Sequence, residues 1–124
     1  MTFYLKRRRE VRPRLGNAPQ REYPKHKRWV RGFCCAVFEA SRGACSGKIE
    51  AHHLRTAANS GKSIKPHDAN CVPLCALHHA EYHTMGRDSF ARQYQIDLGK
   101  IALTLARQSP VREVQEFART MERE

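Results

Sequence analysis

Residues 71–83 read CVPLCALHHAEYH, in which Cys75 is followed closely by three histidines: His78, His79 and His83. An extended segment ends at that cysteine, and a helix is expected over residues 76–84. On such a helix His79 and His83 lie four positions apart and share one face. His78 points about 100° away from His79, because each residue of a helix turns the chain by about that angle. Neighbouring histidines of one helix can therefore serve two different metal ions.

The first candidate metal site combines Cys75 and His78 with cysteines that lie further upstream. The spacing Cys75-x-x-His78 lets a strand-to-helix turn offer two ligands to one tetrahedral ion. Thiolate and imidazole are the ligands that zinc prefers in closed structural sites. Cys45 and Cys35 would supply the other half of the site, through a loop that folds back between them. Cys34 fits the spacing as well as Cys35 does, so the choice between these two neighbours stays open.

The second candidate metal site combines His79 and His83 with the pair His52-His53. The pair falls in an expected short strand, residues 48–54, so its two side chains point to opposite faces. One of the two could complete a divalent metal site, while the other faces the substrate. The sequence therefore predicts a second, open metal site beside the closed zinc site.

Length and composition indicate one small domain with a strongly basic start. The chain has 124 residues, of which 23 are Lys or Arg and 12 are Asp or Glu, for a formal net charge of +11. Residues 1–31 contain 11 of the basic residues and two acids, and no apolar stripe accompanies them. This excess predicts binding to a polyanion, and the alternative is a solvated tail that aids solubility.

Several classes of protein are excluded by the same sequence. No window approaches the roughly 18 consecutive apolar residues of a membrane span, so an integral membrane protein is not expected. Five cysteines without a recognisable secretory signal argue against a disulfide framework. Metal ions are a common remedy for the thin core of such a small domain.

Three pieces of the chain together form a pattern: Glu50-Ala51-His52-His53, Asn70, and Leu74-Cys75-x-x-His78-His79-x-x-x-His83. This pattern resembles the HNH endonucleases of the ββα-metal (His-Me finger) type. It is most similar to the small phage and prophage members of the recombination-enhancement kind. The resemblance implies an α+β fold, with a small ββα-metal HNH core, zinc-binding knuckles and additional C-terminal helices. It divides the chain into a partly flexible basic N-terminal arm (1–28), a nuclease core with structural zinc (29–98) and a C-terminal helical extension (99–124).

The resemblance also assigns catalytic roles. It makes His53 the general base, and an imidazole can take a proton from water near neutral pH. It makes Asn70 the residue that braces the base or its loop. Arg55, two residues after His53, is a candidate phosphate contact, and its alternative is an ordinary surface charge. Lys62 and Lys65 carry the same two interpretations.

The two metal sites differ in role by the same resemblance. The catalytic divalent ion, Mg²⁺ or Mn²⁺, would be held by three histidines: His52, His79 and His83. If His52 does not bind, water molecules would complete the shell of the other two. The structural Zn²⁺ would be held by four residues: Cys35, Cys45, Cys75 and His78.

The function expected is that of a metal-dependent HNH endonuclease, a hydrolase that cleaves phosphodiester bonds of DNA and leaves 5′-phosphate and 3′-hydroxyl ends. One rival is a non-catalytic, zinc-stabilised module that binds nucleic acid, which would leave the second set of histidines without a joint purpose. A second rival is a zinc-stapled adaptor for other proteins. The resemblance implies a phage or bacterial origin and a cytoplasmic location. Single-stranded DNA, double-stranded DNA and RNA all stay open as substrates.

The C-terminal part is expected to be helical. Helices are expected over residues 89–98 and from residue 110 to near the C-terminus, where Val114, Phe117, Ala118 and Met121 recur at helical spacing. This last helix packs either on its own domain or against a second copy of the chain in a homodimer.

Overall fold

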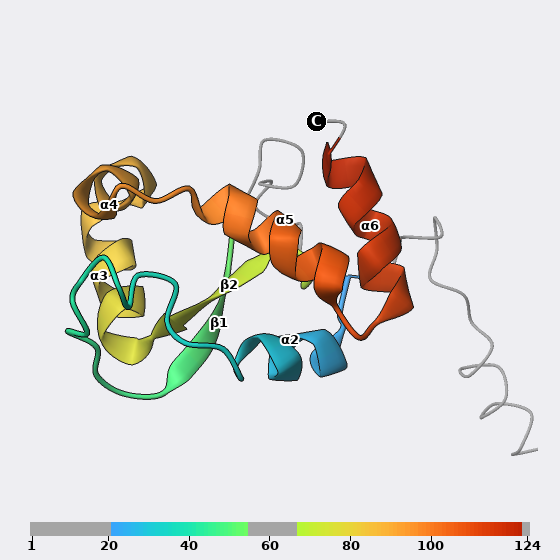
Figure 1. Cartoon of the computed structure of the whole chain (residues 1–124), viewed down its shortest axis with the longest axis horizontal. Coiled ribbons are helices and arrows are strands. Elements are labelled where there is room, and N and C mark those ends of the chain that lie inside the picture. The colour runs from blue at the N-terminus through green and yellow to red at the C-terminus, as the bar shows by residue number, and fades with distance from the viewer. Residues whose placement is uncertain (1–20, 55–66, 123–124) are drawn as a thin grey trace, which may run out of the picture.

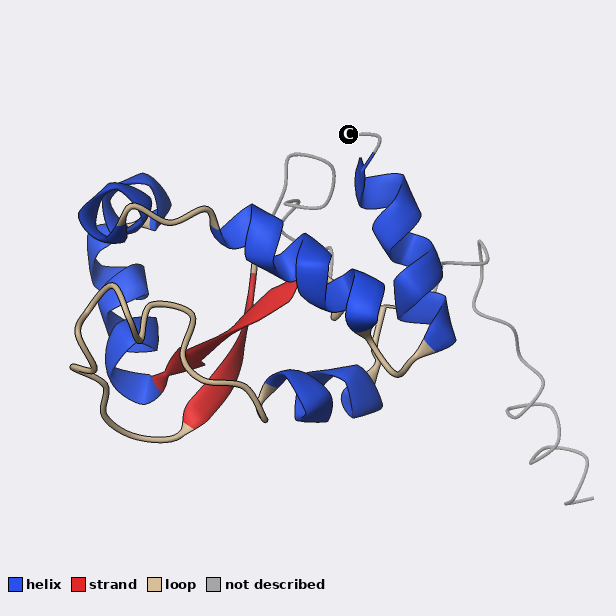
Figure 2. Ribbon diagram, in the orientation of Figure 1, coloured by secondary structure: helices blue, strands red, loops and turns tan. Residues whose placement is uncertain are grey.

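The structure, a computed structural model, describes residues 21–54 and 67–122. It combines helices with one two-stranded antiparallel sheet, so the expected α+β class is confirmed (Figures 1 and 2). The elements in chain order are α2 (Pro24–Val30), β1 (Ile49–His53), β2 (Cys71–Cys75), α3 (Ala76–Met85), α4 (Arg87–Tyr94), α5 (Leu98–Gln108) and α6 (Arg112–Glu122). Within the described ranges, no helix has the length and apolar character needed to cross a membrane.

The sheet forms the centre of the molecule. Its register pairs Ile49 with Cys75 at one end and His53 with Cys71 at the other. Every residue of β2 is buried, because α2, α3 and α5 all pack against this strand. Figure 1 shows α3 leaving the end of β2. Helices α2 and α5 meet at the start of this strand, where Val30, Cys71 and Leu105 form one buried cluster. The short apolar run of β2 is thus a fully buried strand.

Helix α3 starts directly at the end of β2. Cys75 caps its N-terminus, with Sγ accepting the backbone N–H of His78 at 3.4 Å. The helix ends at Gly86, whose φ of 90° favours glycine. The expected helix over 76–84 is therefore confirmed, and the turn before it carries two of the candidate zinc ligands.

The next helices differ from the expectation. The helix predicted over 89–98 is replaced by the shorter α4, which ends because Gln95 adopts a left-handed conformation with a φ of 51°. Asp97 then caps α5, its side chain accepting the backbone N–H of Lys100 at 3.1 Å. Helix α6 packs on its own domain, where Val114 and Ala118 are fully buried against α5.

Helix α2 crosses residue 28, where the boundary between the basic N-terminal arm and the core was expected. Its residues His26 and Val30 lie one turn apart and are fully buried. Nδ1 of His26 and the hydroxyl of Ser109 lie 2.8 Å apart and form a hydrogen bond. Residues 24–28 therefore belong to the packed fold, because this inward face outweighs the basic residues beside it.

Candidate metal centres and the His53–Asp68 pair

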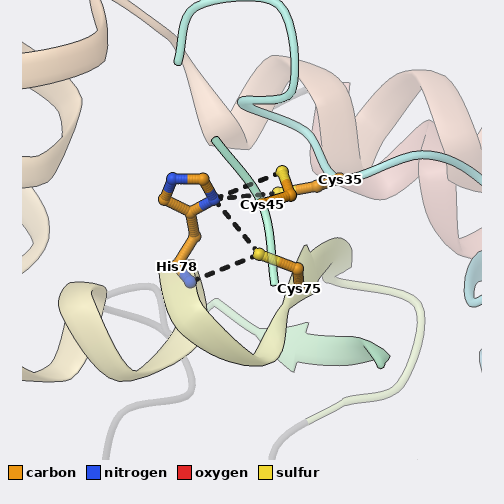
Figure 3. A group of neighbouring side chains, drawn as sticks. All are labelled: Cys35, Cys45, Cys75 and His78. Carbon is orange, nitrogen blue, oxygen red and sulfur yellow. Dashed lines mark hydrogen bonds between the residues drawn. The ribbon is translucent and has the colours of Figure 1, made fainter. Parts of the chain in front are cut away.

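The structure brings three cysteines and one histidine into one cluster: Cys35, Cys45, Cys75 and His78. Their donor atoms all lie within 4.8 Å of one another. Nδ1 of His78 lies 3.5, 3.6 and 3.2 Å from the sulfur atoms of Cys35, Cys45 and Cys75, and Figure 3 shows the four side chains pointing toward one another. Zn–S and Zn–N bonds of about 2.3 and 2.05 Å around a tetrahedral ion place sulfur and nitrogen about 3.5 Å apart. The donor set and its spacing thus fit a structural zinc ion.

The wide gap between Cys35 and Cys45 is closed by tight turns. The backbone N–H of Ala36 donates to the carbonyl of Pro73 at 2.8 Å, which ties the start of the loop to β2. Gly47 ends the loop with a φ of 87°, and a Cβ atom on it would lie only 2.6 Å from the Cβ of Ala76. The loop therefore approaches α3 closely enough to place its cysteines beside the helix.

The choice between the neighbouring cysteines is made by burial. Cys35 is buried and faces His78, whereas Cys34 is exposed and does not belong to the cluster. Cys71 is buried away from the cluster, and its thiol donates to the carbonyl of Asp68 at 3.1 Å. Of the two alternatives left open by the sequence, the geometry places Cys35 among the donors.

The cluster is electrostatically suited to a cation. Burial, then the neighbouring thiols of Cys75 and Cys35, raise the pKa of Cys45 to about 12. Burial raises the pKa of Cys75 too, but hydrogen bonds from the backbone N–H groups of His78 and Ser46 outweigh it and lower that pKa. Three thiolates packed together require a positive charge between them, which a divalent ion supplies.

A second cluster joins β1 to α3: His52, His79 and His83. One nitrogen from each ring lies within 4.8 Å of the others. His52 is 4% exposed, and its Nε2 has no hydrogen-bond partner among the residues that the structure describes. A buried polar atom without a partner is costly, so this nitrogen is available to a ligand. Burial, and then the charges of His79 and His83, lower the pKa of His52 to about 3, which keeps its ring in the neutral form that binds metals.

Glu50 adds a carboxylate behind this second cluster. Its Oε1 lies 2.5 Å from Nδ1 of His79, although the glutamate is not among the donors that converge. A carboxylate that accepts the Nδ1–H of a histidine leaves Nε2 for the metal and fixes the ring orientation. Sequence reasoning assigned Glu50 no role, although its position two residues before His52 on one strand face was a usable signal.

His53 points to the other side of β1, as the strand alternation predicted. Its Nε2 lies 2.8 Å from Oδ1 of Asp68, a carboxylate that is 3% exposed. The other carboxylate oxygen accepts the backbone N–H of Tyr23 at 2.7 Å and lies 3.9 Å from Nζ of Lys27. This pairing makes Nε2 the donor nitrogen of the ring, so that Nδ1 is free to accept a proton.

Asp68 was missed by sequence reasoning, which considered Asn70 instead. The side-chain amide of Asn70 donates to the backbone carbonyl of Leu54 at 3.0 Å, and the backbone carbonyl of Asn70 accepts the N–H of Leu54 at 2.9 Å. Asn70 thus holds the chain that follows His53, whereas Asp68 contacts the imidazole itself. The remaining candidates in this region, Arg55, Lys62 and Lys65, lie outside the described residues.

Comparison with known proteins identifies no family for this chain. No protein-family model matches this chain, and no solved structure matches it. The uncharacterized protein YdfU of Escherichia coli (strain K12) is 36% identical to it over 63 residues. The similarity covers 49% of this chain and 18% of that protein, so the chain spans less than a fifth of the relative's length. The function proposed below therefore depends on the geometry of the site.

Proposed function

We propose that this chain is a metal-dependent endonuclease of the HNH type, with a ββα-metal core and a zinc knuckle, that hydrolyses phosphodiester bonds of DNA. The observation that carries the proposal is that the two neighbouring histidines of β1 face different groups on opposite sides of the strand. His52 faces a cluster of three histidines that fits a divalent ion, and the adjacent His53 faces a buried carboxylate. Phosphodiester hydrolysis needs both an ion at the phosphate and a base for the water, held a few ångströms apart.

The residues of the chain would act as follows. Nδ1 of His53 accepts a proton from the attacking water while Asp68 holds the ring through Nε2. The water oxygen forms a new bond to phosphorus as the bond from phosphorus to the 3′ oxygen breaks. The 3′ oxygen takes up a proton from solvent, which leaves a 5′-phosphate and a 3′-hydroxyl end. A divalent ion such as Mg²⁺ or Mn²⁺, when bound by His52, His79 and His83, stabilises the negative charge that develops on the phosphate and the leaving oxygen.

The rival function, a zinc-stabilised module that only binds nucleic acid, is weaker on one count. It accounts for the cluster of three cysteines and His78 and for the basic charge. It gives no purpose to a solvent-accessible imidazole held by a buried carboxylate, beside three converging histidines. Such pairs of His and acid in a defined geometry are typical of catalytic sites.

Cleavage of supercoiled plasmid tests the proposal. Zinc-loaded wild type is expected to nick the plasmid with Mg²⁺ or Mn²⁺ and not in buffer without divalent ions, and His53→Ala is expected to bind DNA without cutting it. Arg112→Gln, which changes only an exposed ion pair on α6, is the control variant. Full cleavage by His53→Ala in the same metal would disprove the role of the base. Binding without cleavage by wild type in any metal would favour the rival.

A further inference from the structure

Helix α2 carries a concentration of positive charge on one side. Four of the eight residues from 24 to 31 are basic, and none is acidic: Lys25, Lys27, Arg28 and Arg31. The inward side of the helix is fixed by His26 and Val30, which are fully buried. Helical spacing therefore directs the basic side chains away from the core, and all except the half-buried Lys27 are exposed.

Of these four cations, only Lys27 forms an ion pair within the described residues, with Asp68. Lys25, Arg28 and Arg31 form no ion pair with any residue in the described part of the chain. Lys25, Arg28 and Arg31 follow one another at intervals of three residues. By contrast, Arg112 on α6 pairs with Glu116. An uncompensated row of cations of this kind is suited to an external anion.

The row lies beside the candidate base. Nζ of Lys27 lies 3.9 Å from Oδ2 of Asp68, the carboxylate whose other oxygen contacts His53. Val30, which lies between Lys27 and Arg31 in the chain, packs against Cys71, the partner of His53 in the sheet. The cationic face of α2 and the base share one end of the sheet.

The preceding residues enter at the same place. The carbonyl of Arg21 accepts the backbone N–H of Asp68 at 2.9 Å, so the chain reaches α2 from a point directly beside the base. Residues 1–20 add six basic residues and one acid to the sequence before this point. Positive charge therefore continues along the chain from the candidate site.

On the basis of the proposed function, we infer that the outer face of α2, formed by Lys25, Arg28 and the C-cap residue Arg31, binds successive backbone phosphates of the DNA strand on the His53 side of the scissile bond. The spacing along a helix suits a phosphate backbone, which presents one charge at each regular step. Contiguity with the base favours DNA over an anionic lipid surface, which would need no catalytic site beside it.

The test uses the full chain in a His53→Ala background, so that binding is measured without cleavage. The affinity for a fluorescent DNA duplex is measured by anisotropy over a range of salt concentrations. The test variant carries Lys25→Gln, Arg28→Gln and Arg31→Gln. The control variant carries Arg92→Gln, Lys100→Gln and Arg119→Gln, which remove the same charge from exposed positions on α4, α5 and α6.

Each phosphate contact contributes about 0.9 to the slope of log K against log salt on duplex DNA. The test variant should therefore lose about 2.7 from that slope and bind roughly 500-fold more weakly at 0.1 M salt, while the control variant stays near the parent. Equal losses in both variants, or no loss in the test variant, would overturn the inference. So would a loss of binding to phosphatidylserine vesicles with DNA binding unchanged.

Combined with the plasmid-cleavage assay of wild type, this binding experiment separates the inference from the proposed function. If wild type never cleaves DNA but the test variant alone loses affinity, the nuclease proposal fails and the α2 surface stands. If wild type cleaves and the test variant binds as the parent does, the nuclease proposal stands and the α2 surface fails. In the cleaving protein, the three substitutions should raise KM and leave kcat unchanged.

Discussion

Replacing Asp68 by asparagine should slow DNA cleavage without unfolding the protein. The wild-type carboxylate lies 2.8 Å from Nε2 of His53, which places the ring hydrogen on that nitrogen. An asparagine whose oxygen still accepts the N–H of Tyr23 turns its NH₂ group toward His53. The imidazole then has to accept at Nε2, which moves its own hydrogen to Nδ1 and blocks the base.

The size of the loss follows from one hydrogen bond to a charged group, which contributes about 1.5–3 kcal/mol. A tenfold change in rate corresponds to about 1.4 kcal/mol, so kcat should fall roughly 10- to 150-fold. KM should change little, because Asp68 is 3% exposed and lies behind the histidine. A change in kcat alone distinguishes positioning of the base from a loss of DNA binding.

Single-turnover cleavage of plasmid with Mg²⁺ measures the chemical step, and anisotropy measures binding. Thermal unfolding and zinc content show whether the variant is folded. Asp88→Asn, at an exposed aspartate on α4, is the matched control and should cleave as wild type does. Asp68→Ala also removes the acceptor for Tyr23 and should lower the melting temperature as well. Wild-type kcat in a folded Asp68→Asn protein would refute the reasoning.

Three further predictions concern the metal sites and the core. Cys35→Ser should lose zinc and unfold, whereas Cys34→Ser should retain both zinc and fold; equal zinc content by mass spectrometry would contradict the assignment. Glu50→Gln should weaken Mn²⁺ binding about 10- to 100-fold by calorimetry with zinc content unchanged, and an unaltered affinity would remove Glu50 from the site. Burial lowers the pKa of His26 to about 4, below its unfolded value of about 6.5, so the unfolded chain binds more protons between these pH values. The contribution of His26 to the free energy of unfolding should therefore be fully present above pH 6.5 and fall by about 3 kcal/mol as the pH drops to 4. In urea unfolding, His26→Gln should lack this part of the pH dependence. If the free energies of wild type and variant fall equally with pH, His26 is not the responsible group.

Sequence spacing alone predicted the directions of the side chains that lie on helices and strands. His79 and His83 share a helix face, and His52 and His53 alternate across a strand, so the period of each element fixed their directions. Spacing could not choose between Cys34 and Cys35, because the segment that holds them is an irregular loop. That choice depends on the contact of Ala36 with β2, which is a tertiary interaction.

The sequence did not reveal the role of Asp68 or the place of α2 in the fold. Asp68 stands in a loop, and only the pairing of His53 with Cys71 shows that this loop lies opposite the end of β1. Helix α2 was hidden by its composition, since the basic residues around His26 resemble those of the segment before it. Its place in the fold depends on the long-range hydrogen bond to Ser109, which no local pattern indicates.

The turn between β2 and α3 connects the two candidate metal sites. Cys75 and His78 belong to the first cluster, while His79, the next residue of the same helical turn, belongs to the second. The direction of His79 therefore depends on the start of α3, which the first cluster holds against the loop that contains Cys45. The free energy of metal binding at a structural site contributes to the folding free energy of the elements that the metal joins. Zinc at the first cluster would thus act on catalysis indirectly, because it fixes the helix from which the second cluster is built.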